Sequence, residues 1–246
     1  MEKTILNPHD FVKQVTIDCV IFGFENGQLK VLISKINFKG AFHAIITGFI
    51  KNNEDVEKAA GRVVFERTGL KGIYLEQFKV FGKVDRQRRE FIDELIQKNN
   101  LESTTEIYDY QWFTKRHISI GFYALLDITK VNLEHTEIDE SLTWYNIHEV
   151  PSLIMDNNEI LSEAHKSLLA DINNKFNAFN LLPEKFTMRD VQDIYETIFE
   201  REYIRTNFQK KILEMDVLER LEKKFTGAAN KAPYLYKIKN ASLKSQ

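Results

Sequence analysis

The feature that most constrains the fold is a β-hairpin signal near the N-terminus. Val15 to Phe24 is a nearly continuous apolar run, Asn26-Gly27 follows it, and Leu29 to Ile33 is again largely apolar. Both central residues of a type I′ turn have positive φ, which asparagine and glycine tolerate better than other residues. The chain is therefore expected to build a β-sheet in which these two runs are antiparallel neighbours.

A strand, a loop and a helix are expected next, over residues 41–69. Residues 41–50 are mostly apolar and end in a polar turn, and Asn53 is a suitable N-cap for the helix that follows. Apolar residues recur at helical spacing between Val56 and Val64. Gly69 is placed to end this helix in the left-handed conformation.

The middle of the chain alternates between strand and helix patterns. A helical insertion is predicted at about residues 87–115, because apolar residues there have helical spacing and a polar stretch follows them. Residues 118–128 and 144–147 are predicted strands, and residues 159–176 a helix. The stretch 173–184 contains four asparagines and a proline, which disfavour continued helix, so we expect a domain boundary there. The two domains are expected at residues 1–175 and 184–246.

The C-terminal segment has the order helix, turn, helix and β-hairpin. Thr187 and Asp190 match a capping box at the start of the first helix, predicted over 188–199. A second helix is predicted over 205–215, with Phe208, Ile212 and Leu213 facing inward. Residues 234–238 alternate as a strand does. This order is that of a winged helix-turn-helix, in which the second helix enters the major groove of DNA.

Composition and charge narrow the class of protein. Apolar runs such as the six residues Cys19 to Phe24 are far shorter than the about 18 residues that a membrane helix needs, so no membrane association is expected. One cysteine and no signal-peptide pattern make a cytoplasmic location the expectation. Residues 184–246 carry 13 basic and 10 acidic side chains, a net +3, which leaves −5 for the rest of a chain of −2. An acidic body with a basic C-terminal region favours contact with a polyanion through that region.

Residues 48–70 resemble the Nudix box, which reads Gly, five residues, Glu, seven residues, then Arg-Glu-apolar-x-Glu-Glu-x-Gly-apolar. The matching positions in this chain are Gly48, Glu54, Arg62, Val64, Glu66, Gly69 and Leu70. The surrounding element order over about residues 12–175 is also similar to that of the Nudix fold. The resemblance implies an α+β protein, with a Nudix-type α/β/α sandwich around a mixed sheet before the winged helix-turn-helix domain.

Two positions depart from the box in a way that bears on function. In active Nudix enzymes, three clustered glutamates hold Mg²⁺ or Mn²⁺ against a pyrophosphate, and two of these positions here are Val63 and Arg67. Divalent cations of this kind need oxygen ligands, and a guanidinium repels them. We therefore expect no metal site, no catalytic residue and no cofactor. Glu54, Arg62 and Glu66 are expected to be retained for structural reasons.

The two domains together resemble the Nudix-related transcriptional regulators (NrtR-like). This resemblance implies an effector-sensing, dimerising Nudix domain, a winged helix that binds a double-stranded DNA operator, and a sugar or nucleotide sugar such as ADP-ribose as effector. The expected partners are thus operator DNA, the effector and a second copy of the chain. The expected effector-pocket residues are His43, Glu66, Arg67 and Arg86. The expected DNA-binding residues are Arg205, Thr206, Asn207, Gln209, Lys210, Lys211, Lys231, Tyr234, Lys237 and Lys239.

Alternatives remain at this point. The chain could be a Nudix hydrolase that cleaves a nucleoside diphosphate derivative such as ADP-ribose, although Val63 and Arg67 disfavour it. It could also be a protein-interaction module in which both domains are repurposed. For Arg86, a surface salt bridge is an equal alternative to effector binding. The aromatic residues 108–113 of the insertion fit either a lid or a contact with a partner chain.

Overall fold

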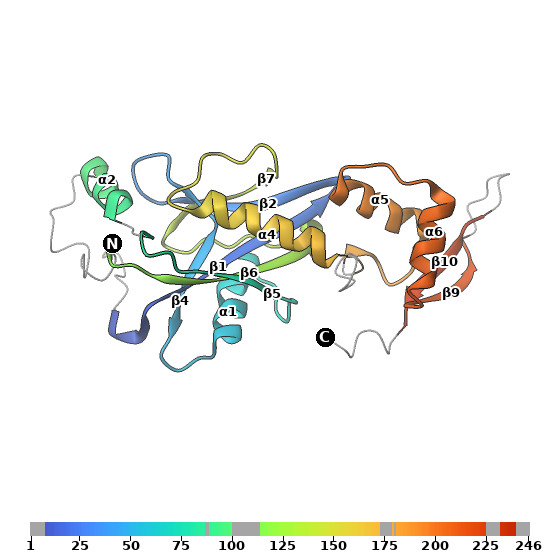
Figure 1. The fold of residues 1–246 in the computed structure, drawn as a ribbon, viewed down its shortest axis with the longest axis horizontal. Coiled ribbons are helices and arrows are strands. Elements are labelled where there is room, and N and C mark those ends of the chain that lie inside the picture. Colours follow the sequence, from blue (N-terminus) through green and yellow to red (C-terminus); the bar gives the residue numbers. More distant parts are fainter. Residues whose placement is uncertain are drawn as a thin grey trace. The chain divides into compact units, whose positions relative to one another are not determined.

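The computed structural model describes residues 8–86, 89–99, 114–172, 179, 181–224 and 232–239 (Figure 1). The chain divides into two compact units. The first comprises Met1–Gly23 with Lys30–Leu168, and the second comprises Phe24–Leu29 with Leu169–Gln246. Within the described ranges, no helix is both long and apolar enough to cross a membrane.

A seven-stranded sheet forms the centre of the first unit. The strand order is β3-β2-β1-β6-β5, with β4 paired to β1 and β7 paired to β2. The strands are β1 (Phe11–Glu25), β2 (Gln28–Ile36), β3 (His43–Ala44), β4 (Ile46–Lys51), β5 (Glu76–Phe81), β6 (Ile118–Asp127) and β7 (Asp139–Asn146), with short 3₁₀ turns at Pro8–Asp10 and Ile128–Lys130. The predicted hairpin is confirmed, since Asn26 and Gly27 have φ of 51° and 72° between β1 and β2.

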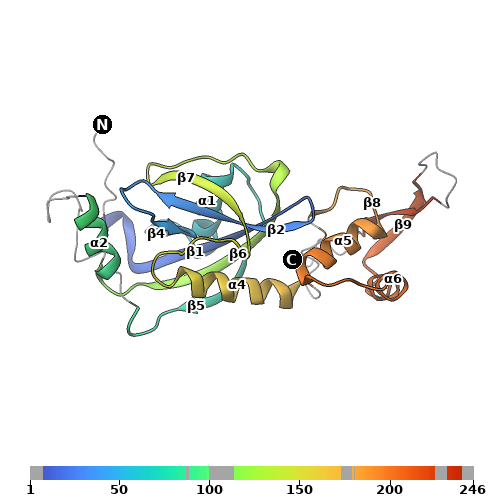
Figure 2. The same ribbon diagram turned by 90° about the horizontal axis from the view of Figure 1, so that it is seen from above.

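Helices cover both faces of this sheet, α1 (Val56–Thr68) on one and α4 (Asn157–Asp171) on the other (Figures 1 and 2). Alternation along β1 explains the layers, because successive side chains point to opposite faces. Ile17, Cys19 and Ile21 belong to the core beneath α1. Phe22 points to the other face, where its ring lies 6.1 Å from that of His165 on α4. The predicted α+β sandwich is confirmed.

The ends of α1 show one wrong prediction and one correct one. The N-cap is Asp55, not Asn53, and its side chain makes no capping hydrogen bond. The cause is tertiary, because Glu54 is fixed by hydrogen bonds to the Lys51 amide and to Arg62, which holds residues 51–54 in a turn before the helix. Gly69 ends the helix with φ of 67°, as predicted.

The predicted insertion contains one described helix, α2 (Arg89–Asn99). Residues 87–88 and 100–113, including the aromatic group at 108–113, lie outside the described residues. The expected boundary stretch at 173–184 also lies partly outside them, at 173–178 and 180. Helix α4 ends at Asp171, five residues before the predicted end.

The winged-helix part consists of two helices and a small antiparallel sheet of order β8-β10-β9. Its elements are β8 (Phe186–Thr187), α5 (Met188–Phe199), α6 (Arg205–Glu214), β9 (Leu218–Lys223) and β10 (Tyr234–Ile238). The capping box at Thr187 and Asp190 is confirmed in both directions. Phe208 and Ile212 are buried, but Leu213 is 42% exposed, so its predicted inward position is wrong. Adjacent helical residues point about 100° apart, and Ile212 takes the place that faces the core.

Candidate DNA-binding and effector sites

Arg62 on α1 connects the two glutamates that the sequence retains from the box. Its Nη2 donates to Glu54 Oε1 at 2.6 Å and to the Phe49 carbonyl at 2.7 Å, and its Nη1 donates to Glu66 Oε1 at 3.0 Å. The hydrogen bond from Arg62 lowers the pKa of the Glu54 carboxyl below its usual value. Both carboxylates therefore have a cationic partner within the protein.

Arg67 occupies a buried position next to this pair. Its side chain is 6% exposed, and its Nε lies 2.9 Å from Asp139 Oδ2 as an ion pair outside linear hydrogen-bond geometry. Its Nη1 donates to Glu66 Oε2 at 3.3 Å. Asp139 also accepts hydrogen bonds from the Ser34 and Thr136 hydroxyls, at 2.5 and 2.6 Å. Asp139 was not among the expected residues, because it lies far from the box in the chain and follows no motif.

Val63 makes the helix pack closely on the sheet. It is fully buried, and a Cβ added to Gly48 on β4 would lie 2.2 Å from Val63 Cγ2. Gly48 is thus required here by a close approach between α1 and β4. Among the described residues, no group of three or more His, Cys, Asp or Glu side chains is placed to hold a metal ion. The described carboxylates of the box, Glu54 and Glu66, are both bonded to Arg62.

Arg86 makes buried ion pairs, so the alternative of a salt bridge is correct about the pairing but not about a surface position. Its Nε donates to Asp156 Oδ2 at 2.5 Å, its Nη2 lies 3.3 Å from Asp18 Oδ2, and its Nη1 donates to the His117 carbonyl at 3.0 Å. Asp18 is 1% exposed and also accepts from Thr47 Oγ1 at 2.8 Å. Because His117 follows the insertion and Arg86 precedes it, this side chain ties the two ends of the insertion together.

The four expected effector residues do not form one cluster. Glu66 and Arg67 are in contact on α1. Arg86 contacts Asp18, which alternates with Ile17 and Cys19 and so points to the sheet face opposite α1. His43 on β3 is half-buried, with its ring 6.5 Å from that of Tyr145. An effector role for these residues stays a prediction.

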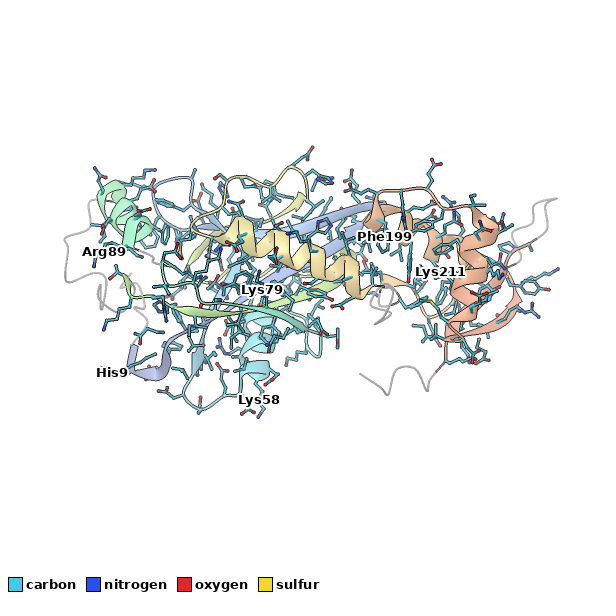
Figure 3. The ribbon with its side chains drawn as sticks, in the orientation of Figure 1. His9, Lys58, Lys79, Arg89, Phe199 and Lys211 are labelled. Atoms are coloured by element: carbon cyan, nitrogen blue, oxygen red, sulfur yellow. The ribbon has the colours of Figure 1, made fainter. Side chains whose placement is uncertain are left out.

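Helix α6 presents its N-terminal turn to solvent. Arg205, Thr206 and Asn207 are exposed, and none of them forms a side-chain hydrogen bond or ion pair with another described residue. Gln209 is half-buried, and Lys210 lies 3.9 Å from Glu214. Lys211, labelled in Figure 3, is exposed. This end of the helix is therefore a polar, basic surface.

The turn before α6 is held by partly buried polar contacts. Gln192 on α5 is 2% exposed, and its Nε2 donates to the Tyr203 carbonyl at 2.9 Å. The Tyr203 amide in turn donates to Glu196 Oε1 at 2.9 Å, which lowers the pKa of Glu196. Ile204, the N-cap of α6, makes no side-chain cap and is 71% exposed. The helix start is thus fixed in place by its neighbours and not by a cap of its own.

The wing contains fewer unpaired charges than the sequence suggests. Lys237 lies 3.2 Å from Glu219, and Lys239 lies 2.6 Å from Asp216. Lys231 lies outside the described residues. Tyr234 is 40% exposed, and two basic residues that the sequence analysis missed, Arg220 and Lys223, lie over its ring. The sequence pattern predicted a strand only at residues 234–238, and the structure adds β9, which carries these two residues.

Comparisons with known proteins agree with this arrangement. Residues 178–238 match the NrtR DNA-binding winged helix domain. The chain is 25% identical over 215 residues to the ADPR responsive transcriptional repressor NtrR of Acinetobacter baylyi, a match that covers 83% of this chain and 74% of the relative.

Two solved structures share the fold over nearly the whole chain. Shewanella oneidensis NrtR complexed with a 27mer DNA superposes with a TM-score of 0.66 at 18% identity, covering 94% of this chain and 96% of the other. A MutT/nudix family protein from Enterococcus faecalis gives a TM-score of 0.65 at 17% identity, covering 93% and 87%. The predicted combination of a Nudix fold with a winged helix is therefore confirmed.

Proposed function

We propose that this NrtR-like, Nudix-related chain is a ligand-responsive transcriptional regulator. It binds operator DNA through its winged helix and senses a sugar or an ADP-ribose-like effector through its Nudix domain. The observation that carries the proposal is the exposed start of α6, within a domain that matches the NrtR DNA-binding winged helix. The name of the Acinetobacter relative, an ADPR responsive repressor, supports ADP-ribose as the first effector to test.

The recognition surface has the chemistry that DNA contact needs. Arginine can bind guanine in a bidentate manner, and asparagine can bind adenine in the same way, both in the major groove. Arg205 and Asn207 are exposed on the first turn of α6, which is the part of a recognition helix that reaches base edges. Thr206, Gln209, Lys210 and Lys211 complete the proposed contact surface, toward either bases or phosphates.

The Nudix domain is proposed to have no hydrolase activity. Arg67 brings a positive charge to a position where the family's box has a metal-binding glutamate, and Val63 brings a hydrocarbon to another. The remaining carboxylates, Glu54 and Glu66, are already bound by Arg62. A protein that acts on DNA and has this composition is proposed to reside in the cytoplasm.

DNA binding tests the regulator function. Fluorescence anisotropy would compare a duplex from the chain's own upstream region with a scrambled duplex of equal length. We expect preference for the upstream duplex, and a loss of about 1–3 kcal/mol in Arg205→Ala and in Asn207→Ala if each contacts a base. Lys58→Ala on α1, also at an exposed side chain, is the control and should bind normally. Equal wild-type affinity for both duplexes would contradict the proposal.

Effector and enzyme tests use the same protein. Titration of ADP-ribose and of simple sugars into the DNA complex should change operator affinity for one of them. Incubation of ADP-ribose with Mg²⁺ should give no turnover above a protein-free control. Robust hydrolysis that Glu66→Gln abolishes would restore the hydrolase alternative.

A further inference from the structure

We infer that the wing contacts the DNA backbone through Arg220, Lys223 and Tyr234, called here the basic clasp, and not through Lys237 and Lys239. The inference rests on the proposed function and assigns part of its DNA surface. The partner is the phosphate backbone of duplex DNA beside the groove that α6 enters.

The basic clasp holds two cations against one aromatic ring. Arg220 Cζ lies 4.7 Å and Lys223 Nζ lies 5.3 Å from the centroid of the Tyr234 ring. Both basic residues are exposed, and no carboxylate of a described residue pairs with either of them. A cation–π contact at an exposed site positions a cation without neutralising it. Two positive charges are thus held ready for an anion.

The other lysines near the wing each form an ion pair with a carboxylate. Lys237 pairs with Glu219 and Lys239 with Asp216, and Lys185 lies 3.0 Å from Glu222. A phosphate that approached Lys237 or Lys239 would meet the partner carboxylate as well, and like charges in contact repel. Their net charge toward DNA is therefore close to zero, although the sequence alone counts them as basic.

The register of the hairpin adds a positional argument. Tyr234 pairs with Lys223, the pair nearest the tip of the β9–β10 hairpin, whereas Ile238 pairs with Leu218 at its base. Lys239 lies at that base, where its amide donates to the Val217 carbonyl. The basic clasp thus includes the last strand pair before the hairpin tip, and Lys237 and Lys239 lie nearer the base.

Matched double variants of the full chain test the inference. Arg220→Ala/Lys223→Ala and Lys237→Ala/Lys239→Ala each remove two positive charges from the same hairpin. Affinity for the upstream duplex and for the scrambled duplex is measured from 50 to 200 mM salt. The quantity compared is the affinity at 50 mM salt divided by the affinity at 200 mM salt. Loss of one phosphate contact lowers this ratio by about 3- to 4-fold, so the Arg220→Ala/Lys223→Ala variant should lower it by about tenfold on both duplexes. The Lys237→Ala/Lys239→Ala variant should leave it nearly unchanged.

Two further variants separate charge from structure. Arg220→Lys keeps the cation and should keep the salt dependence, and Tyr234→Ala should weaken binding to both duplexes while the charges remain. Thermal melting of every variant checks that the domain is folded. If the Lys237→Ala/Lys239→Ala variant lost as much salt dependence as the Arg220→Ala/Lys223→Ala variant, the inference would be wrong while the proposed function stood. If wild-type protein bound neither duplex, the proposed function would fail and the inference with it.

Discussion

Arg67 is a cation enclosed almost completely by protein, and Asp139 explains why the fold tolerates it. The Asp139 side chain is 2% exposed and accepts two hydroxyl hydrogen bonds beside the ion pair. Removing one partner of a buried pair costs far more than the pair contributes, because the other charge stays buried without a partner. Arg67, which stands where the box has a glutamate, is thus a buried ion-pair partner that the domain needs for its stability.

Arg67→Met should therefore destabilise the protein severely. It keeps the length of the side chain but leaves the Asp139 carboxylate without its cation, and we expect a loss of about 3–5 kcal/mol in the free energy of unfolding. Urea denaturation followed by circular dichroism measures it. Lys58→Met is the matched control, since Lys58 and Asp55 form an exposed pair that should contribute less than about 1 kcal/mol. Equal stability of the two variants would rule out a structural role for the buried pair.

Tyr195 on α5 should make the winged-helix part less stable at alkaline pH. Burial raises the pKa of Tyr195 to about 12, and its hydroxyl donates to the Ile172 carbonyl. The folded state holds the proton more tightly than the unfolded state, whose tyrosines titrate near 10, so this stability is complete below about pH 10 and is lost between about pH 10 and 12. The loss should be on the order of 2–3 kcal/mol. Melting curves at pH 9 and pH 11 should show a smaller alkaline loss in Tyr195→Phe than in wild type.

At the scale of elements, the two helices of the winged-helix part begin in opposite ways. Helix α5 starts with a complete capping box, whereas α6 starts at Ile204, which caps nothing and is largely exposed. Ile204→Ser should add a capping hydrogen bond and stabilise the protein by about 0.5–1 kcal/mol, with little loss because the isoleucine buries little area. Thermal melting beside Thr187→Ala, which should lose a comparable amount, tests this. Destabilisation by Ile204→Ser would contradict the prediction and would mean that packing of the isoleucine side chain contributes more than a cap.

Most of the correct predictions of helix and strand ends depended on the chemistry of residues that are neighbours in the sequence. The type I′ turn at Asn26-Gly27, the αL end at Gly69 and the capping box at Thr187 depend on neighbouring residues alone, and the structure confirms each of them. Long-range contacts decided what the sequence missed. Asp139 reaches Arg67 only after β7 pairs with β2, and the N-cap of α1 moved because Arg62 fixes Glu54.

In the proposed DNA-binding site, too, local features could be predicted from the sequence and long-range contacts could not. The basic character of residues 205–211 is visible in the sequence, because a two-turn stretch of helix exposes most of its polar side chains. The pairing of Lys237 and Lys239 with carboxylates is not visible, because it depends on the register of β9 against β10. Counting basic residues therefore overestimated the positive charge of the wing.

At the scale of the whole molecule, the size of the recognition element argues for two copies on the DNA. Helix α6 has 10 residues and so is about 15 Å long, which is enough to read only a few base pairs. Symmetric dimers overcome this limit by placing two recognition helices in successive major grooves, about 34–36 Å apart. We therefore predict a homodimer on an operator with two half-sites.

Inserting five base pairs between the half-sites rotates them by about half a turn and should abolish tight binding. Sedimentation of the free protein should show a dimer at micromolar concentration. Monomers alone, together with equal affinity for the spaced operator, would mean that one winged helix binds by itself, and the specificity would then have to come from a single half-site.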